Sequence, residues 1–395
     1  MVELLSPAGS WNCLRAAVKG GCDSVYFGLT ELNMRTLKGG FELNELSEIA
    51  KFCHKNKVKC YLCLNSIVFD GEIGNIEEIV SEAKKAGIDA VICWDLGVLE
   101  ICKKYKIGVH LSTQASCSNK KSLEVYKKLG FSRIIPCREL NLEQVKNLTG
   151  NGVEVEVFVH GALCYAISGR CFFSQEIYNS SANRGKCIHP CRRRYKLTDI
   201  ETLKEIEVEN DYFMSAKDLC ALPFLDRIID AGVSALKIEG RNKGAEYVHE
   251  ITSVYREAID AISDGKFEMV KEKLLENAGK VYNRGFSSGF YLGLPTSDDI
   301  TNSYGSKALE KKIQVGRVEN YFVKKKVIAV HLTDSDLMVG DEIIISGKTT
   351  FIRMKVESLE VNEKKVSIVL KGGSVGISIG ERARKGDYVY KIMKS

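Results

Sequence analysis

Short apolar segments with the composition of β-strands recur along the first 241 residues, and most are followed by an amphipathic segment. In Asn75–Gly87 and Ser122–Gly130, for example, apolar residues return every three or four positions and a glycine ends the segment, as in a helix. Strands that alternate with helices pair in parallel, and eight such units predict a (β/α)8 barrel. A doubly wound open sheet is the alternative, but no GxGxxG follows the first segment to favour it. The eight strand-like segments are Val2–Gly9, Asp23–Gly28, Val58–Ser66, Asp89–Asp95, Gly108–Gln114, Arg133–Leu140, Val153–Ala162 and Ser234–Arg241.

The pattern changes after residue 245. Glu246–Ser263 and Lys266–Gly279 predict two helices, the first of which closes the barrel, and a linker rich in glycine and aromatic residues follows. Five or six short alternating segments with turns then predict a small C-terminal all-β barrel. We therefore expect a barrel over 1–245 with a cysteine-rich insert at about 160–220, closing helices and linker over 246–305, and a β-barrel over 306–395.

The composition is that of a globular chain, with 45% hydrophobic and 27% charged residues. We find neither a signal-peptide pattern nor an apolar run long enough to span a membrane, and we expect a cytoplasmic protein. Stable disulfides are rare in that compartment, so the fourteen cysteines indicate metal binding or catalysis where they cluster. Basic clusters in the insert and in the last third suit an anionic partner, although such clusters are more often a solvated face.

Five cysteines gather in the connection between the seventh and eighth predicted strands. They lie in HGALCYAISGRCFFSQ (His160–Gln175), in NRGKCIHPCRRRY (Asn183–Tyr195) and at Cys220. A zinc site usually shows CxxC pairs, and this window has none. A cysteine protease could use Cys164 with His160, but it leaves the other thiols unexplained. An iron–sulfur cluster needs about four converging thiolates of variable spacing and is the favoured interpretation, with inert thiols as the remaining one.

Polar residues follow nearly every predicted strand, where the βα loops of such a barrel form its active site. His160 and Glu239 end strands beneath the insert and are candidates for proton transfer, although each could instead fix the insert by a hydrogen bond. The arginines of the insert could bind an anionic substrate or offset the negative charge of a cluster. The candidate substrate-binding residues are Asn65, Gln114, Arg170, Arg192, Arg193 and Arg241.

The cysteine segments, followed by SAKDLC (Ser215–Cys220) and LKIEGR (Leu236–Arg241), resemble in order the signature of the collagenase-like peptidase family, U32. LLSPAGS (Leu4–Ser10), YFGLTELNMR (Tyr26–Arg35) and HLSTQASCSN (His110–Asn119) resemble its upstream blocks, and the resemblance runs nearly from end to end. The family is named for proteolysis. It also includes prephenate-dependent RNA hydroxylases and the oxygen-independent hydroxylation proteins of ubiquinone synthesis, which carry a 4Fe–4S cluster.

The resemblance implies a 4Fe–4S cluster held by Cys164, Cys171 and Cys187, with Cys220 as the preferred fourth ligand and Cys191 as its substitute. It also implies hydroxylation, and the C-terminal β-barrel favours RNA over a quinone as the substrate. The wobble uridine of tRNA is the first candidate, with prephenate as co-substrate bound by arginines. The alternatives are a peptidase, a non-catalytic iron–sulfur partner and a ubiquinone-type hydroxylation protein. We expect RNA and a redox partner or second family member as partners, and neither a membrane nor DNA.

Overall fold

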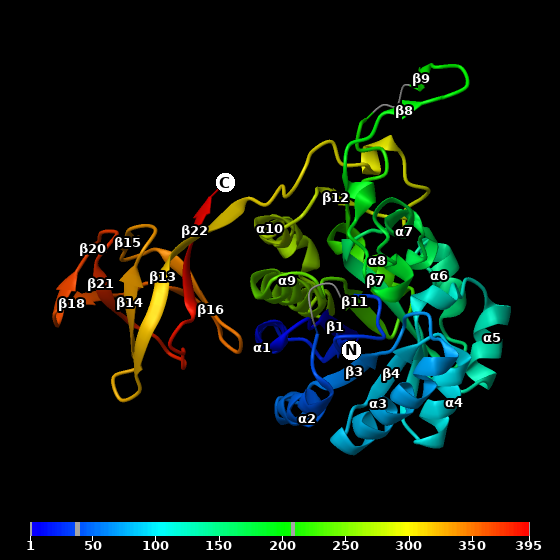
Figure 1. Ribbon diagram of the computed structural model, residues 1–395, viewed down its shortest axis with the longest axis horizontal. Helices are drawn as coiled ribbons and strands as arrows, with labels where there is room; N and C mark the ends of the chain where they lie inside the picture. The colour runs from blue at the N-terminus through cyan, green and yellow to red at the C-terminus, as the bar shows by residue number, and fades with distance from the viewer. Residues whose placement is uncertain (1, 36–39, 207–209, 395) are drawn as a thin grey trace.

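The computed structural model describes residues 2–35, 40–206 and 210–394, and its first part is a closed barrel of eight parallel strands (Figure 1). The barrel closes because the last strand pairs with both the first and the seventh. Each strand falls within one predicted segment, so the expected (β/α)8 barrel is confirmed. The strands are β1 (Glu3–Pro7), β2 (Ser24–Phe27), β3 (Lys59–Cys63), β4 (Ala90–Cys93), β5 (Gly108–Leu111), β6 (Arg133–Ile134), β7 (Glu154–Ala162) and β11 (Ala235–Ile238).

Amphipathic helices surround the barrel. The third helix shows the pattern, since its buried residues Ile76, Ile79, Val80 and Ala83 fall on one face. The longest helix, α9, packs against α1 and β1 and covers the seam where the barrel closes. None of the helices in the described part is long and apolar enough to cross a membrane. The helices are α1 (Trp11–Lys19), α2 (Leu46–Lys55), α3 (Ile73–Ala86), α4 (Leu96–Lys104), α5 (Lys120–Lys128), α6 (Leu142–Leu148), α8 (Leu225–Asp230), α9 (Ala245–Ser263) and α10 (Phe267–Lys280).

Side chains fill the interior of the barrel. Lys237 and Arg133 pair with the buried Glu156 at 2.8 and 3.2 Å, and Arg133 also pairs with Glu3 at 2.8 Å. These paired charges and an apolar layer from several strands fill the interior, and active sites of such barrels lie at the carboxyl ends of the strands. The layer contains Leu5, Tyr26, Tyr61, Cys63, Ala90, Ile92 and Ile135.

The insert leaves the barrel at the end of β7 and returns as β10 (Asp218–Cys220), which pairs antiparallel with β7. Between them lie α7 (Phe173–Tyr178) and a hairpin of β8 (Leu197–Thr198) and β9 (Glu205–Ile206), which projects away from the barrel (Figure 1). Downstream of α10, β12 (Phe286–Ser287) pairs with the other side of β10. Gly161 permits the branching, because its φ is 110° and a Cβ there would lie 2.5 Å from the carbonyl oxygen of Glu239.

The C-terminal part is a separate antiparallel domain with its own apolar core. It has more strands than the five or six expected, because strands of two or three residues show too little alternation to be recognised. Eight of them form one sheet, and β15 pairs with β20. The strands are β13 (Glu310–Phe322), β14 (Val327–Leu332), β15 (Leu337–Met338), β16 (Glu342–Ser346), β17 (Phe351–Lys355), β18 (Leu359–Val361), β19 (Lys364–Val366), β20 (Ile368–Val369), β21 (Ser374–Ser378) and β22 (Tyr388–Lys394).

This β domain is docked beside α1 and α9 (Figure 1). Arg353 of β17 pairs with Glu250 of α9 at 2.9 Å and with Glu310 at 3.3 Å. Lys19 of α1 donates a hydrogen bond to the carbonyl oxygen of Phe351 at 2.7 Å. Ion pairs and a hydrogen bond therefore join the β domain to the barrel.

Candidate functional site

Four cysteines of the insert line one cavity of about 280 Å³ over the mouth of the barrel. Cys164 follows β7, Cys171 precedes α7, and Cys187 and Cys191 lie on either side of His189. The insert thus brings together thiols that are up to 27 residues apart in the sequence. The rest of the lining is mainly apolar and includes Leu163, Tyr165, Phe173, Pro190 and Met214.

Burial and nearby arginines set the protonation of these thiols. Burial raises the pKa of Cys164, but Arg138, a backbone amide and Arg35 outweigh it, so the pKa lies below its usual value. Burial raises the pKa of Cys191 to about 11, and the other three cavity thiols contribute to the rise. A bound metal cation stabilises neighbouring thiolates and so would offset the effect of burial on the pKa of both thiols.

The arrangement does not fit a single zinc ion. Tetrahedral Zn–S bonds of about 2.3 Å place the sulfur atoms about 3.8 Å apart. Among the described residues, three His, Cys, Asp or Glu side chains have their ligand atoms within 4.8 Å of one another at the other end of the barrel, and not at the four thiols. The cavity of about 280 Å³ also equals roughly nine water volumes. Four thiols with apolar walls and nearby arginines fit an iron–sulfur cluster better.

Cys220 lies outside this cavity. It is on β10, directly opposite His160 of β7, and is 2% exposed. Burial raises the pKa of Cys220 to about 12, and its sulfur interacts with the hydroxyl of Tyr255 on α9. The expected preference for Cys220 over Cys191 therefore does not match the structure, in which Cys191 joins the other three thiols.

A smaller cavity of about 60 Å³ occupies the mouth of the barrel beneath the insert. Its lining includes the cations Arg35, Arg138, Lys237 and Arg241, and a single carboxylate, Glu239, which lies 3.5 Å from Arg35. The Nε of Arg138 is buried and has no hydrogen-bond partner in the described part of the chain. The excess of cations suits an anionic group.

A third cavity, of about 410 Å³, lies between the insert, the start of α9 and the segment after α10. Arg192 and Arg284 line it, and the Nε of each is buried without a hydrogen-bond partner among the described residues. Burial and the nearby Arg284 hold the pKa of Arg192 below its usual value. Tyr282 and Lys243 line the same cavity, with the ammonium 3.3 Å from the ring centroid.

Arg35 lines all three cavities and so connects the thiols, the barrel mouth and the third cavity. Sequence reasoning placed Arg138 among the polar residues at the rim of the barrel but not among the candidate substrate-binding residues, and it did not single out Arg35. Both follow predicted strands, Arg35 in the YFGLTELNMR segment and Arg138 just after the sixth strand. That position, at the carboxyl end of a barrel strand, was the available signal.

His160 does not line any of these three cavities. Its ring packs against Tyr247, Tyr255 and Phe286, and its Nδ1 lies 3.3 Å from the Tyr255 hydroxyl. Burial lowers the pKa of His160 to about 4. The pairing of β7 with β11 shifts register just before His160, and such a bulge turns a side chain away from the face that alternation predicts. His160 is therefore a buried structural residue beneath α9.

Four of the six predicted substrate-binding residues line the cavities, and two do not. Arg170 is exposed and donates a hydrogen bond to Ser116 at 2.9 Å, and Arg193 lies over the ring of Tyr178 at 5.0 Å. Those lining the cavities are Asn65, Gln114, Arg192 and Arg241.

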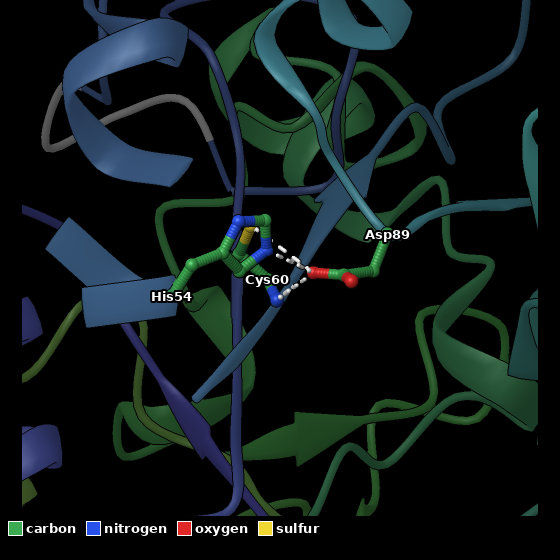
Figure 2. A group of neighbouring side chains, drawn as sticks. All are labelled: His54, Cys60 and Asp89. Atoms are coloured by element: carbon green, nitrogen blue, oxygen red, sulfur yellow. Dashed lines mark hydrogen bonds and ion pairs between the residues drawn. The ribbon is translucent and has the colours of Figure 1, made fainter. Parts of the chain in front are cut away.

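Figure 2 shows the compact ligand group at the opposite end of the barrel, formed by His54, Cys60 and Asp89. One carboxylate oxygen of Asp89 accepts from the Cys60 amide at 2.8 Å and lies 3.0 Å from His54 Nε2. Asp23 makes the same bond to the amide of Leu4, also at 2.8 Å, without a histidine. The arrangement is thus explained as a hydrogen bond that joins the start of one strand to the next.

Comparison with known proteins places the chain in a family. A model of peptidase family U32 matches residues 9–301, about three quarters of the chain. The chain belongs to peptidase family U32. An uncharacterised protease of Methanocaldococcus jannaschii is 40% identical and covers 100% of this chain and 99% of its own length. A collagenase of Porphyromonas gingivalis is 38% identical over 99% and 98%. The tRNA hydroxylation protein P1 of Bacillus subtilis is 31% identical over 87% and 83%.

The resemblance drawn from the sequence motifs is thereby confirmed. The part of the chain that the U32 model matches contains every residue that lines the three cavities. The β domain lies beyond it. The names of the U32 relatives point to two chemistries, hydrolysis of a peptide and hydroxylation of RNA.

Proposed function

We propose that this U32 protein hydroxylates a pyrimidine of RNA, without molecular oxygen as donor, using a 4Fe–4S cluster on Cys164, Cys171, Cys187 and Cys191. The observation that carries the proposal is the convergence of these four thiols in one cavity that shares Arg35 with two cation-rich cavities. We take the wobble uridine of tRNA as the first candidate substrate, by analogy with the Bacillus subtilis relative.

Replacing a ring hydrogen with a hydroxyl group from water releases two protons and two electrons. The bound cluster would supply a one-electron route from the substrate to an external electron acceptor. The protein's part would be to hold the cluster's negative charge beside Arg35 and Arg192, which line the thiol cavity, and beside Arg138, which lowers the pKa of Cys164. Fixed cations of this kind raise the reduction potential of a buried cluster.

The cations of the mouth cavity support binding of an anionic co-substrate, for which we propose prephenate. The cavity, of about 60 Å³, receives one carboxylate rather than a whole molecule. Arg138, with its unpaired buried Nε, and Arg241 are placed to bind such a carboxylate by charge-assisted hydrogen bonds. Arg35 lines both the mouth cavity and the third cavity, whose about 410 Å³ is left to the nucleotide of the RNA substrate and falls within the usual range for ligand sites.

Glu239 is the residue we assign to proton transfer. It lines both the mouth cavity and the third cavity, and its partner Arg35 is 3.5 Å away. A carboxylate in this position can accept a proton released when the hydroxyl group forms. His160 takes no part, because it faces α9.

A thiol hydrolase is the second candidate, because two of the relatives are named as a protease and a collagenase. Cys164 has a lowered pKa and His189 lines the same cavity. Burial, with Arg35 and Arg192, lowers the pKa of His189 to about 4, and a base that weak activates a thiol poorly at neutral pH. The site therefore favours a bound cluster over a thiol–imidazole pair.

Anaerobic purification of the full chain, followed by iron and acid-labile sulfide assays, tests the proposal. We expect about four irons and four sulfides per chain with broad absorption near 400 nm. Zinc alone, or no metal in protein from oxygen-free cells, would refute the cluster and leave the hydrolase in first place.

A further inference from the structure

A chain of cations and aromatic rings crosses from the β domain to the third cavity. On the domain's sheet, the guanidinium of Arg317 lies 4.3 Å from the ring centroid of Tyr388, and the rings of Tyr388 and Tyr390 are nearly parallel at 6.0 Å. Lys312 lies 4.9 Å from the ring of Tyr390. These residues share one face of the sheet, because Arg317 stands opposite Tyr388 on the paired strands β13 and β22.

An ion pair joins this face of the sheet to the barrel. Lys312 pairs with Glu246 of α9 at 2.7 Å, and Glu246 lines the third cavity together with Tyr282 and Lys243. A smaller cavity of about 160 Å³ between the two domains is lined by Lys312, Glu246 and Tyr282. Tyr282 therefore lies at the junction, 37% exposed, with Lys243 over its ring. We call Arg317, Tyr388, Tyr390, Lys312 and Tyr282 the aromatic ladder.

At its inner end the ladder meets the arginine pair of the third cavity. Arg192 and Arg284 keep buried Nε groups without hydrogen-bond partners among the described residues, which is costly unless an anion accepts from them. Arg284 has one carboxylate partner, Asp218, at 2.6 Å. Arg192 donates instead to neutral oxygens, among them the carbonyl of Ala216. A phosphate group is an anion with enough acceptor oxygens to satisfy both guanidinium groups.

We propose that the aromatic ladder is the path of a single-stranded RNA segment, and that Arg192 and Arg284 hold a phosphate next to the nucleotide that enters the third cavity. Rings that alternate with cations offer base-stacking and phosphate contacts in turn. The two cations of the ladder, Arg317 and Lys312, favour a polyanion over an apolar protein surface. The exposed aliphatic residues of β13 and β22, Ile313 and Met393, alternate with the ladder residues along the strands and so face the other side of the sheet. This inference rests on the proposed RNA activity.

Fluorescence anisotropy with a labelled, unmodified anticodon stem–loop and the full chain tests the ladder. We expect Tyr388→Ala to weaken binding roughly 5- to 150-fold, because loss of one stacking ring has an effect of that size. Arg317→Ala should lower the slope of log affinity against log salt by about one. Tyr388→Phe keeps the ring and should bind nearly as well as the wild type.

Phe322→Ala is the matched control, since Phe322 is an exposed aromatic residue of the same strand, β13, beyond the ladder. Lys325→Ala controls for charge at that end. If the wild type binds RNA and all variants bind equally well, the ladder is wrong but RNA remains the substrate. If the wild type binds no RNA while it retains its iron, both the ladder and the proposed RNA activity are refuted. If the control variants alone weaken binding, RNA lies on the other end of β13 and the ladder is refuted.

Discussion

Replacing Cys191 or Cys220 by alanine should separate two roles that the sequence does not distinguish. Cys191 lines the cavity with three other thiols, whereas Cys220 is 2% exposed beside Tyr255 in the barrel wall. We expect Cys191→Ala to hold three irons or fewer per chain, because one of four ligands is lost. We expect Cys220→Ala to retain about four.

The free energy of unfolding should fall more in Cys220→Ala than in Cys191→Ala. Removing one buried atom of about methylene size from Cys220 costs about 0.8 kcal/mol of transfer free energy, and the cavity left behind adds about 0.5 kcal/mol. A loss of about 1.3 kcal/mol in a unit of roughly 300 residues lowers Tm by about 2 °C. Half-buried Cys191 should show less loss in the metal-free protein.

Iron and sulfide assays on anaerobically purified variants, together with calorimetry of their metal-free forms, measure both effects. Cys102→Ala is the matched control, because Cys102 is a fully buried thiol of α4 that lies outside the insert and does not line any of the three cavities. The reasoning would be refuted if Cys220→Ala lost its iron and Cys191→Ala kept it.

Three further results are expected. Arg35→Gln should raise KM for an anionic co-substrate about 10- to 100-fold, because it removes a charged hydrogen-bond donor from the cavities. The iron content should stay unchanged, and unchanged steady-state kinetics would contradict the prediction. Because burial holds the pKa of His160 at about 4, below its ordinary 6.5, the folded state loses stability as pH falls from about 6.5 to about 4. At pH 5 the free energy of unfolding is lower by about 2 kcal/mol. Urea titrations at pH 7.5 and 5.0 should show that His160→Gln removes this loss of stability. An unchanged pH dependence in the variant would contradict the assignment. Arg353→Met leaves Glu250 and Glu310 unpaired at the domain junction and should weaken docking by about 2–4 kcal/mol; limited proteolysis should cut the 301–309 linker faster, and equal rates would contradict it.

The architecture could be predicted because local pattern carries it. Each barrel strand is a short apolar run, and each intervening helix has a continuous apolar face, so their alternation specifies parallel closure. The β domain was less accessible, because β19 and β20 have only three and two residues. Strands that short are defined by their partners rather than by their own sequence.

The site was only partly predictable, because its membership depends on contacts between remote segments. Spacing alone could not choose between Cys191 and Cys220, since the choice depends on β10 pairing with β7 and carrying Cys220 into the wall. His160 was expected at the rim because it lies near the end of a predicted strand, whereas a bulge in β7 turns its ring toward α9. Arg35 became part of the site through the closure of the barrel, which brings the loop after β2 to the insert.

The most direct test of the account is mass spectrometry of nucleosides after incubation of RNA with the iron-loaded chain, prephenate and an artificial electron acceptor under nitrogen. The same preparation is assayed in parallel against gelatin peptides. We predict a pyrimidine nucleoside that gains one oxygen atom with the wild type and not with Cys191→Ala. Cleaved peptide and unmodified RNA, with cleavage that persists in iron-free protein, would contradict the account and identify this U32 protein as a hydrolase.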